Sequence, residues 1–405
     1  MNMLIVNRHL VYLFLCNFSI LFIGFGLFPI LPLYAAKFGA SPSMTGIYLA
    51  ITYVAISVGS ILAGQLSESL PRKALFVAAG LLGIPALFLL GQAQSLWQVM
   101  VLTALVWLAG GIGLSISNVL TGLRTSSSGR GKAFGVLALA SPLGAAIGGL
   151  VVGRCLEVGG YSMMFTVLAF IWSLWPALAI TRVEDPPACT PLPGNSSKSS
   201  DPSLRPGPVF TLLLGTVLLA SMTISVGRMG LSLAMKDQHF SASEISTANA
   251  IGGLVTIPII LLISTFSDKL GRKRFLLAGY LVALGSMVML FYASDLWQFW
   301  MVSSLVLVSR SVISSMSPAY ATDVVRRRFL GKALPLVGTM NWVSGVAGFA
   351  GAGYVLDSFG GASSYGAAAF VSFLAVAILA FLPASLRQQP QAVVEVKEAV
   401  TAHGD

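Results

Sequence analysis

The chain has 405 residues, of which 56% are hydrophobic and only 9% are charged, and its formal net charge is +10. This composition is far from that of soluble globular domains and is typical of integral membrane proteins. The basic residues are divided among short loops instead of forming one patch, which argues against nucleic acid as a partner and favours the lipid bilayer.

Twelve apolar stretches follow one another along the chain, and each is long enough to cross a hydrocarbon core of about 30 Å as a helix. The first six cover residues 10–36, 44–66, 74–92, 97–120, 133–154 and 161–181. The last six cover residues 209–235, 244–266, 275–293, 297–318, 333–356 and 364–386. We therefore expect an all-α integral membrane protein with twelve transmembrane helices.

The longest connection between spans is VEDPPACTPLPGNSSKSSDPSLRPGP, whose Pro, Ser and Gly content is typical of a flexible linker. It predicts four parts: an N-terminal six-helix bundle, a linker, a C-terminal six-helix bundle and a tail, at residues 1–182, 183–208, 209–387 and 388–405. Loops on the side of this linker carry 19 of the 24 Lys and Arg residues. The positive-inside rule thus places both termini in the cytoplasm, as expected for a multi-pass protein of the inner (plasma) membrane.

Several short sequences recur at a constant offset of 200 residues. The pairs are ESLPRKALF and DKLGRKRFL (from residues 68 and 268), QSLWQ and SDLWQ (94 and 294), GKA (131 and 331), and Leu-Glu with Leu-Asp (156 and 356). The constant offset indicates duplication of a six-helix unit. Two such units insert with the same orientation, and a binding site near the midplane between parallel halves is a common transporter arrangement.

The duplicated loops resemble GxLxDRxGRR, the signature that follows the second helix in the major facilitator superfamily. GQLSESLPRK (64–73) departs from it at Glu68, Ser69 and Pro71, whereas TFSDKLGRKR (265–274) is closer. The resemblance implies this family's fold of two parallel six-helix pseudo-repeats and transport by alternating access.

In the family these loops act as a conformational latch, in which the acid bonds to a loop Arg near a helix N-terminus. The resemblance implies that Glu68 and Asp268 are latch acids, with Arg72 and Arg272 as cationic partners and Gly271 in the turn between. The alternative is that these charges are solvated and only fix the orientation in the membrane.

LASPLGAAIGG (139–149) resembles the GPxxGG helix motif that is common in the family's exporters. Its small residues Gly144, Gly148 and Gly149 predict close approach of helix backbones, and Pro142 predicts a bend. Tight packing and a role in antiport are both open as the function of this helix.

Only two ionisable residues lie inside spans, Arg228 and Arg310. A charge at the bilayer centre costs at least about 2.5 kcal/mol, which favours a functional role. The resemblance implies that helices one, four, seven and ten line a central cavity, so both arginines would face it. Two guanidinium groups there favour a carboxylate, phosphate or sulfonate. Alternatively, each binds backbone carbonyls, or Arg228 reaches the outer interface.

Other polar or aromatic side chains in the spans are candidates for the cavity lining. They are Asn17, Tyr34, Asn118, Asn341 and Trp342. Each could equally be a packed or hydrogen-bonded residue between helices.

No carboxylate or imidazole lies at the middle of a span. Protons remain a candidate coupling ion, carried by the substrate or by one of the peripheral acids Glu157, Asp237, Glu244, Asp323 and Asp357. Three separated histidines and no P-loop argue against an enzyme, a metal site, a cofactor or an ATP-driven pump.

The sequence therefore predicts a secondary active transporter for a small organic solute. We expect an efflux permease whose substrate is anionic or amphiphilic. A facilitated uptake carrier and a transport-inactive receptor or scaffold on the same fold are the alternatives.

Overall fold

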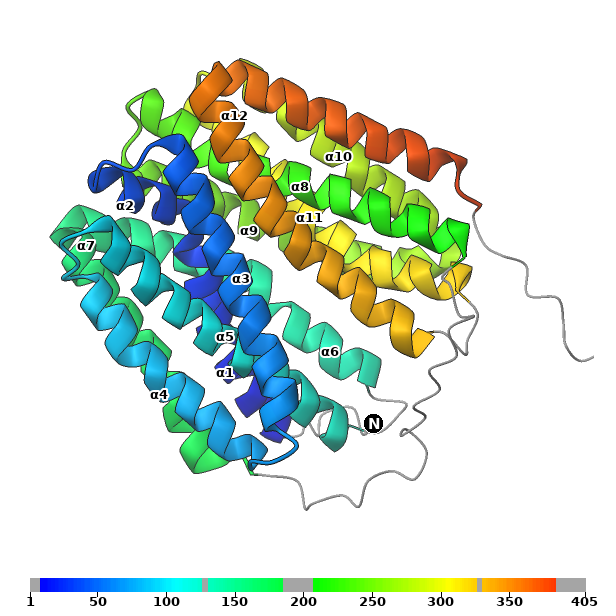
Figure 1. Cartoon of the computed structure of the whole chain (residues 1–405). Helices are drawn as coiled ribbons and strands as arrows, with labels where there is room; N and C mark the ends of the chain where they lie inside the picture. Colours follow the sequence, from blue (N-terminus) through cyan, green and yellow to red (C-terminus); the bar gives the residue numbers. More distant parts are fainter. Residues whose placement is uncertain (1–7, 126–129, 185–206, 326–329, 384–405) are drawn as a thin grey trace, which may run out of the picture.

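The computed structural model describes residues 8–125, 130–184, 207–325 and 330–383, except for the side chains of residues 124, 130–132, 264–265, 267–270 and 330–332. The described chain consists of helices (Figure 1). In order these are α1 (Arg8–Gly26), η1 (Phe28–Ile30), α2 (Leu31–Lys37), α3 (Pro42–Leu66), α4 (Arg72–Leu90), α5 (Leu96–Arg124), α6 (Arg130–Ala138), α7 (Ala140–Arg182), α8 (Pro208–Asp237), α9 (Ala242–Leu270), α10 (Arg272–Tyr292), α11 (Leu296–Val324) and α12 (Leu330–Phe381). The expected tail and nearly all of the expected linker lie outside the described residues.

Ten helical segments of the described chain are long and apolar enough to cross a membrane. Two of them, Ala133–Arg182 and Ala333–Phe381, have 50 and 49 residues, about twice what one crossing needs. α7 and α12 each turn at a glycine with positive φ, 65° at Gly160 and 80° at Gly360, where other residues are disfavoured. Each part is long enough to cross, which reconciles ten segments with the twelve expected spans.

The recurring sequences form recurring local structures. In the first copy, the Gln98 side-chain carbonyl accepts a hydrogen bond from the backbone N–H of Gln94. In the second, the Gln298 carbonyl accepts from the backbone N–H groups of Ser294 and Asp295, in a capping box at the start of α11. The repeated Ser/Asp-Leu-Trp-Gln pattern is therefore a helix start.

Helices α1 and α3–α7 pack on one another, and so do α8–α12. The two sets meet closely along two helix pairs, α7 with α9 and α3 with α12 (Figure 1). We call these two contacts the distal seam, because they approach most closely near the end that carries loops 38–41 and 238–241, opposite the N-terminus. A Cβ atom added at Gly149 would lie 2.7 Å from the backbone oxygen of Ser246 in α9, so glycine allows the close approach.

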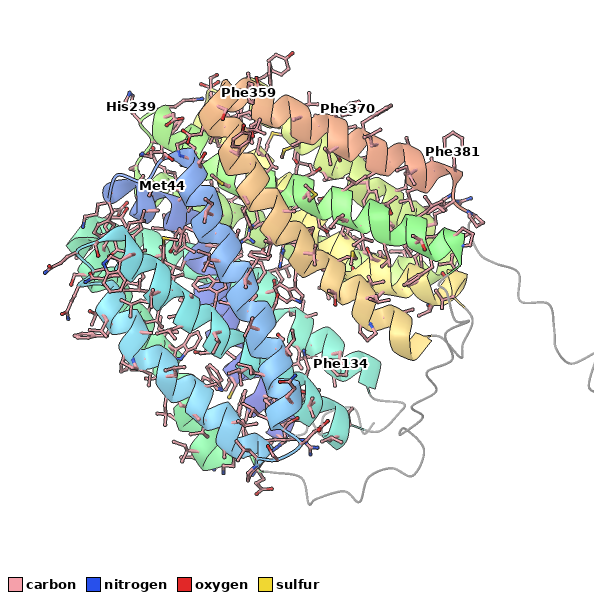
Figure 2. All side chains as sticks on the ribbon, in the orientation of Figure 1. Met44, Phe134, His239, Phe359, Phe370 and Phe381 are labelled. Carbon is pink, nitrogen blue, oxygen red and sulfur yellow. The ribbon has the colours of Figure 1, made fainter. Side chains whose placement is uncertain are left out.

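Large apolar side chains project from the outside of the bundle, among them Phe359, Phe370 and Phe381, which are 65%, 62% and 91% exposed (Figure 2). In water such a surface would be unfavourable, whereas lipid chains solvate it. The exposed belt therefore agrees with insertion in a bilayer.

Candidate functional site

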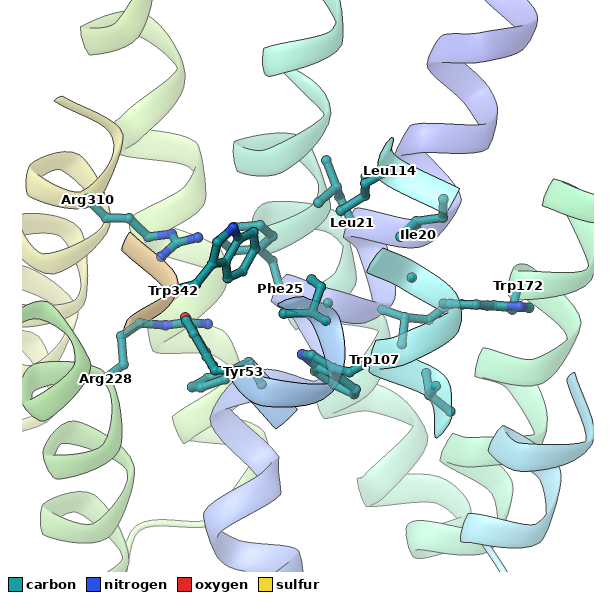
Figure 3. A pocket seen from close by; sticks show the side chains of 16 residues that line it. Ile20, Leu21, Phe25, Tyr53, Trp107, Leu114, Trp172, Arg228, Arg310 and Trp342 are labelled. Carbon is teal, nitrogen blue, oxygen red and sulfur yellow. The ribbon is translucent and has the colours of Figure 1, made fainter. Parts of the chain in front are cut away.

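A cavity lies between the two sets of helices (Figure 3). Its walls come from α1, η1, α3, α5, α7, α8, α11 and α12. Most of the lining is aliphatic or aromatic, and its two charged residues are Arg228 and Arg310. An apolar lining with a few convergent polar groups is the composition of a small-molecule site.

Arg228 enters the cavity from α8 and is only 8% exposed. Its Nη1 donates a hydrogen bond of 3.0 Å to the hydroxyl of Tyr53, which belongs to α3 in the other set of helices. The guanidinium carbon also lies 3.5 Å from the ring centroid of Phe28, a cation–π contact. These contacts hold the side chain inside the protein and direct its charge into the cavity.

Arg310 reaches the same cavity from α11, on the same side as Arg228 in Figure 3. Its guanidinium carbon lies 5.1 Å from the ring centroid of Phe25, and the side chain also interacts with the Tyr53 hydroxyl. The described lining contains neither aspartate nor glutamate. The two positive charges thus share the Tyr53 hydroxyl and meet no carboxylate within the described lining.

The structure separates the other predicted lining residues. Trp342 lines the cavity, whereas Asn17, Tyr34, Asn118 and Asn341 do not. Asn17 donates a hydrogen bond to Ser117, which joins α1 to α5, and another to the backbone carbonyl of Leu13 in its own helix.

The remaining three residues also lie away from the cavity. Tyr34 donates to the carbonyl of Leu90 near the distal end. Asn341 accepts a 3.0 Å hydrogen bond from Ser221 of α8, and Asn118 is exposed.

Tyr53, Phe25, Phe28 and Trp107 also line the cavity, and none of them was predicted from the sequence. The sequence does contain a signal for Tyr53, because a tyrosine inside an apolar span needs a partner for its hydroxyl and the two arginines inside spans need acceptors.

The duplicated loops are described in part. In the second copy, Nη1 of Arg272 donates to Asp323 at 3.1 Å and to Thr322 at 2.8 Å, tying the start of α10 to the end of α11. Gly271 precedes α10 with a φ of 91°. The side chain of Asp268 lies outside the described residues.

The first copy differs from the second. Glu68 is exposed, and Nε of Arg72 is buried without a hydrogen-bond partner among the described residues. The position 200 residues before Asp323 is Leu123, so the first copy lacks the corresponding acid.

The small residues of α7 lie against neighbouring backbones. Cβ atoms added at Gly144 and Gly148 would lie 2.7 and 2.8 Å from carbonyl oxygens of α1, and Gly149 meets α9. Pro142 is buried in the same stretch. This part of α7 therefore joins α1 to the distal seam, a contact that requires small residues.

Two carboxylates at equivalent positions of the repeat bridge the distal seam. Glu157 at the turn of α7 accepts a hydrogen bond from Ser243 of α9, and Asp357 of α12 accepts from Ser43 of α3. Glu157 also pairs with Arg154 at 3.0 Å. These bonds, with Ser243 and Ser43 as the largest causes, lower the pKa of both carboxyl groups below their ordinary values.

A family model described as Major Facilitator Superfamily matches residues 13–235 and, a second time, residues 212–402. The chain belongs to the major facilitator superfamily. It is therefore a multi-pass membrane transporter with the all-helical fold of that family, as the loop motifs indicated.

Curated relatives are distant. The chain is 24% identical over 286 residues to the multidrug resistance protein MdtG of Enterobacter lignolyticus, covering 67% of each chain. It is 24% identical over 317 residues to MdtG of Proteus mirabilis, covering 75% of this chain and 77% of the relative.

Solved structures resemble the whole molecule. The nucleoside transporter NupG has a TM-score of 0.79 at 13% identity, covering 92% of this chain and 100% of that one. A bacterial homologue of the human lysosomal transporter Spinster, inward-facing and occupied, has a TM-score of 0.73 at 13% identity, covering 94% and 98%. At these identities the likeness concerns the fold alone.

Proposed function

We propose that the protein is a secondary transporter that exports a small organic anion or anionic amphiphile across the inner membrane by alternating access. The observation that carries the proposal is the pair of arginines, Arg228 and Arg310, in one cavity whose described lining holds no carboxylate. The names of the MdtG relatives support export as the direction.

The electrostatics of the cavity favour an anion over a cation. Each guanidinium group brings a positive charge into the cavity, and the aromatic and aliphatic walls screen that charge poorly. A bound cation would be repelled by both side chains. A carboxylate, sulfonate or phosphate could accept hydrogen bonds from both.

The distal seam and the duplicated loops supply the elements that alternating access needs. Release of α7 from α9 and of α3 from α12 would open the distal end, which the positive-inside rule assigns to the outside. At the other end, Asp268 and Arg272 would form the stronger latch, and Glu68 with Arg72 the weaker one. Protons remain the candidate coupling ion. The candidate proton carriers Asp323, Glu157 and Asp357 lie outside the cavity.

Flux into proteoliposomes tests the proposal. Purified protein should transport a labelled organic anion in a saturable way and leave an organic cation of the same size untouched. Arg310→Ala should abolish flux while the protein still inserts, because the anion loses one of its two charged partners. Lys236→Ala, which removes an exposed basic side chain at the distal end of α8, is the control and should leave flux within about twofold.

Two results would contradict the proposal. One is unchanged flux by Arg310→Ala, and the other is preferential transport of the cation. Anion binding with no flux under any gradient would favour a receptor on the same fold.

A further inference from the structure

The cavity has a polar end and an aromatic middle. At the polar end, Arg228 and Arg310 approach the Tyr53 hydroxyl. Next to it, the rings of Tyr53 and Trp342 lie 5.8 Å apart at an angle of 62°, in edge contact. Phe28 stands 6.3 Å from Tyr53, also edge to face. An entering molecule thus meets the charges at one end and ring faces and edges beside them (Figure 3).

The Tyr53 hydroxyl is unusually placed for a buried phenol. Its oxygen accepts the hydrogen bond from Arg228, so the oxygen is satisfied while its own proton has no acceptor among the described residues. Tyr53 is only 6% exposed. Three groups that donate hydrogen bonds, two of them cationic, therefore point into one region that offers them no anionic acceptor.

A carboxylate satisfies this arrangement better than a larger anion. Its two oxygens can accept several hydrogen bonds, which matches the donors of Arg228, Arg310 and Tyr53. The other walls carry almost only carbon, from residues such as Ile20, Val106 and Leu114. A phosphate ester bearing a sugar would leave the sugar hydroxyl groups without hydrogen-bond partners there, whereas an aromatic ring has no hydrogen bonds to lose.

We propose that the cavity binds an aromatic carboxylate, with the carboxylate held by Arg228, Arg310 and the Tyr53 hydroxyl and the ring packed between Trp342 and Phe25. This inference rests on the proposed function, because it assigns the substrate class of the same site. It adds Tyr53 as a binding residue and the aromatic wall as the determinant of specificity.

Calorimetric titration of the full chain in lipid nanodiscs tests it with three matched compounds. These are 2-naphthoate, its fully saturated analogue decahydro-2-naphthoate, and 2-naphthylmethylammonium. We expect 2-naphthoate to bind about tenfold more tightly than the saturated acid, and the ammonium compound to show no binding. Tyr53→Phe should weaken 2-naphthoate binding about tenfold, the effect of one hydrogen bond to a charged group.

Tyr34→Phe is the control, since it removes a buried tyrosine hydroxyl that lies outside the cavity and should change binding less than twofold. Trp342→Leu is a second variant, which should abolish the preference for the aromatic acid and keep binding of both acids. Elution profiles and melting temperatures of the ligand-free variants show whether each is folded.

Equal affinity for the two acids, or unchanged binding by folded Tyr53→Phe, would overturn the inference. If both acids bind equally and Arg310→Ala removes both, the proposed anion transport stands and only the aromatic specificity falls. If the ammonium compound binds and the acids do not, the proposed function falls as well.

Discussion

Gly353→Ala should force α12 and α3 apart at the distal seam. A Cβ atom at this position of α12 would lie 2.5 Å from the carbonyl oxygen of Pro42 and 2.9 Å from Cα of Gly46, both in the first turns of α3. Ordinary contact begins near 3.4 Å, so the two helices must separate by about 0.9 Å at this point.

The free-energy cost of the added methyl group can be taken from known overpacking substitutions. Insertion of a methyl group into a closely packed contact costs about 1–3 kcal/mol. The contact joins the two sets of helices, so in an alternating-access transporter the cost falls only on the state in which the distal end is closed. The population should therefore shift toward the distal-open state by about 5- to 150-fold.

Electron–electron distance measurement between spin labels detects this shift. Gln94 and Ser294 are exposed at equivalent distal positions of the two copies, and cysteines there on a cysteine-free background would carry the labels. The variant should gain a longer-distance component. Gly351→Ala is the control, because an added Cβ there meets nothing within 4 Å. Identical distance distributions for Gly353→Ala and the unmodified protein, or an equal shift in the control, would refute the reasoning.

The contacts around the seam and loops lead to three further predictions. The pKa values of Glu157 and Asp357 are lowered, so the two carboxylates stabilise the closed distal end at neutral pH. This stabilisation is lost on acidification below their ordinary pKa values of 4.5 and 3.8. The distances between the same spin labels should therefore not change between about pH 8 and pH 5. The double variant Glu157→Gln/Asp357→Asn should lengthen the distances already at neutral pH, and a response confined to pH 6–8 would exclude these groups. Asp323→Ala should lower the stability by about 1 kcal/mol in thermal unfolding, as it removes a partly exposed ion pair, while Glu68→Ala should stay within about 0.5 kcal/mol; equal losses would argue against the pairing with Arg272. Asp268→Asn should shift the balance between inward- and outward-open states, and unaltered cysteine accessibility would count against the latch.

The positions of the two arginines could be predicted because burying a charge is costly and leaves few alternatives. Arg228 and Arg310 stood out as the two ionisable residues within spans, and the structure places both in one cavity. The constant offset of 200 likewise indicated the duplicated helix starts at Gln98 and Gln298.

Uncharged polar residues could not be assigned in this way. Asn17 and Asn341 satisfy hydrogen bonds between neighbouring helices, a role that the residue type shares with ligand binding. Which of the two applies depends on the rotation of each helix about its axis, and that is set by packing of the whole bundle. Tyr53 was missed for the converse reason, since its importance comes from arginines 175 residues and more away in the chain.

A structure with a bound iodinated aromatic acid tests the central claim most directly. Electron cryo-microscopy of the protein with 4-iodobenzoate would locate the carboxylate and the heavy iodine atom independently. We predict the carboxylate within hydrogen-bonding distance, about 3 Å, of both Arg228 and Arg310, with the iodine toward the apolar wall. Ligand density away from this cavity, or guanidinium groups turned into lipid, would contradict the account.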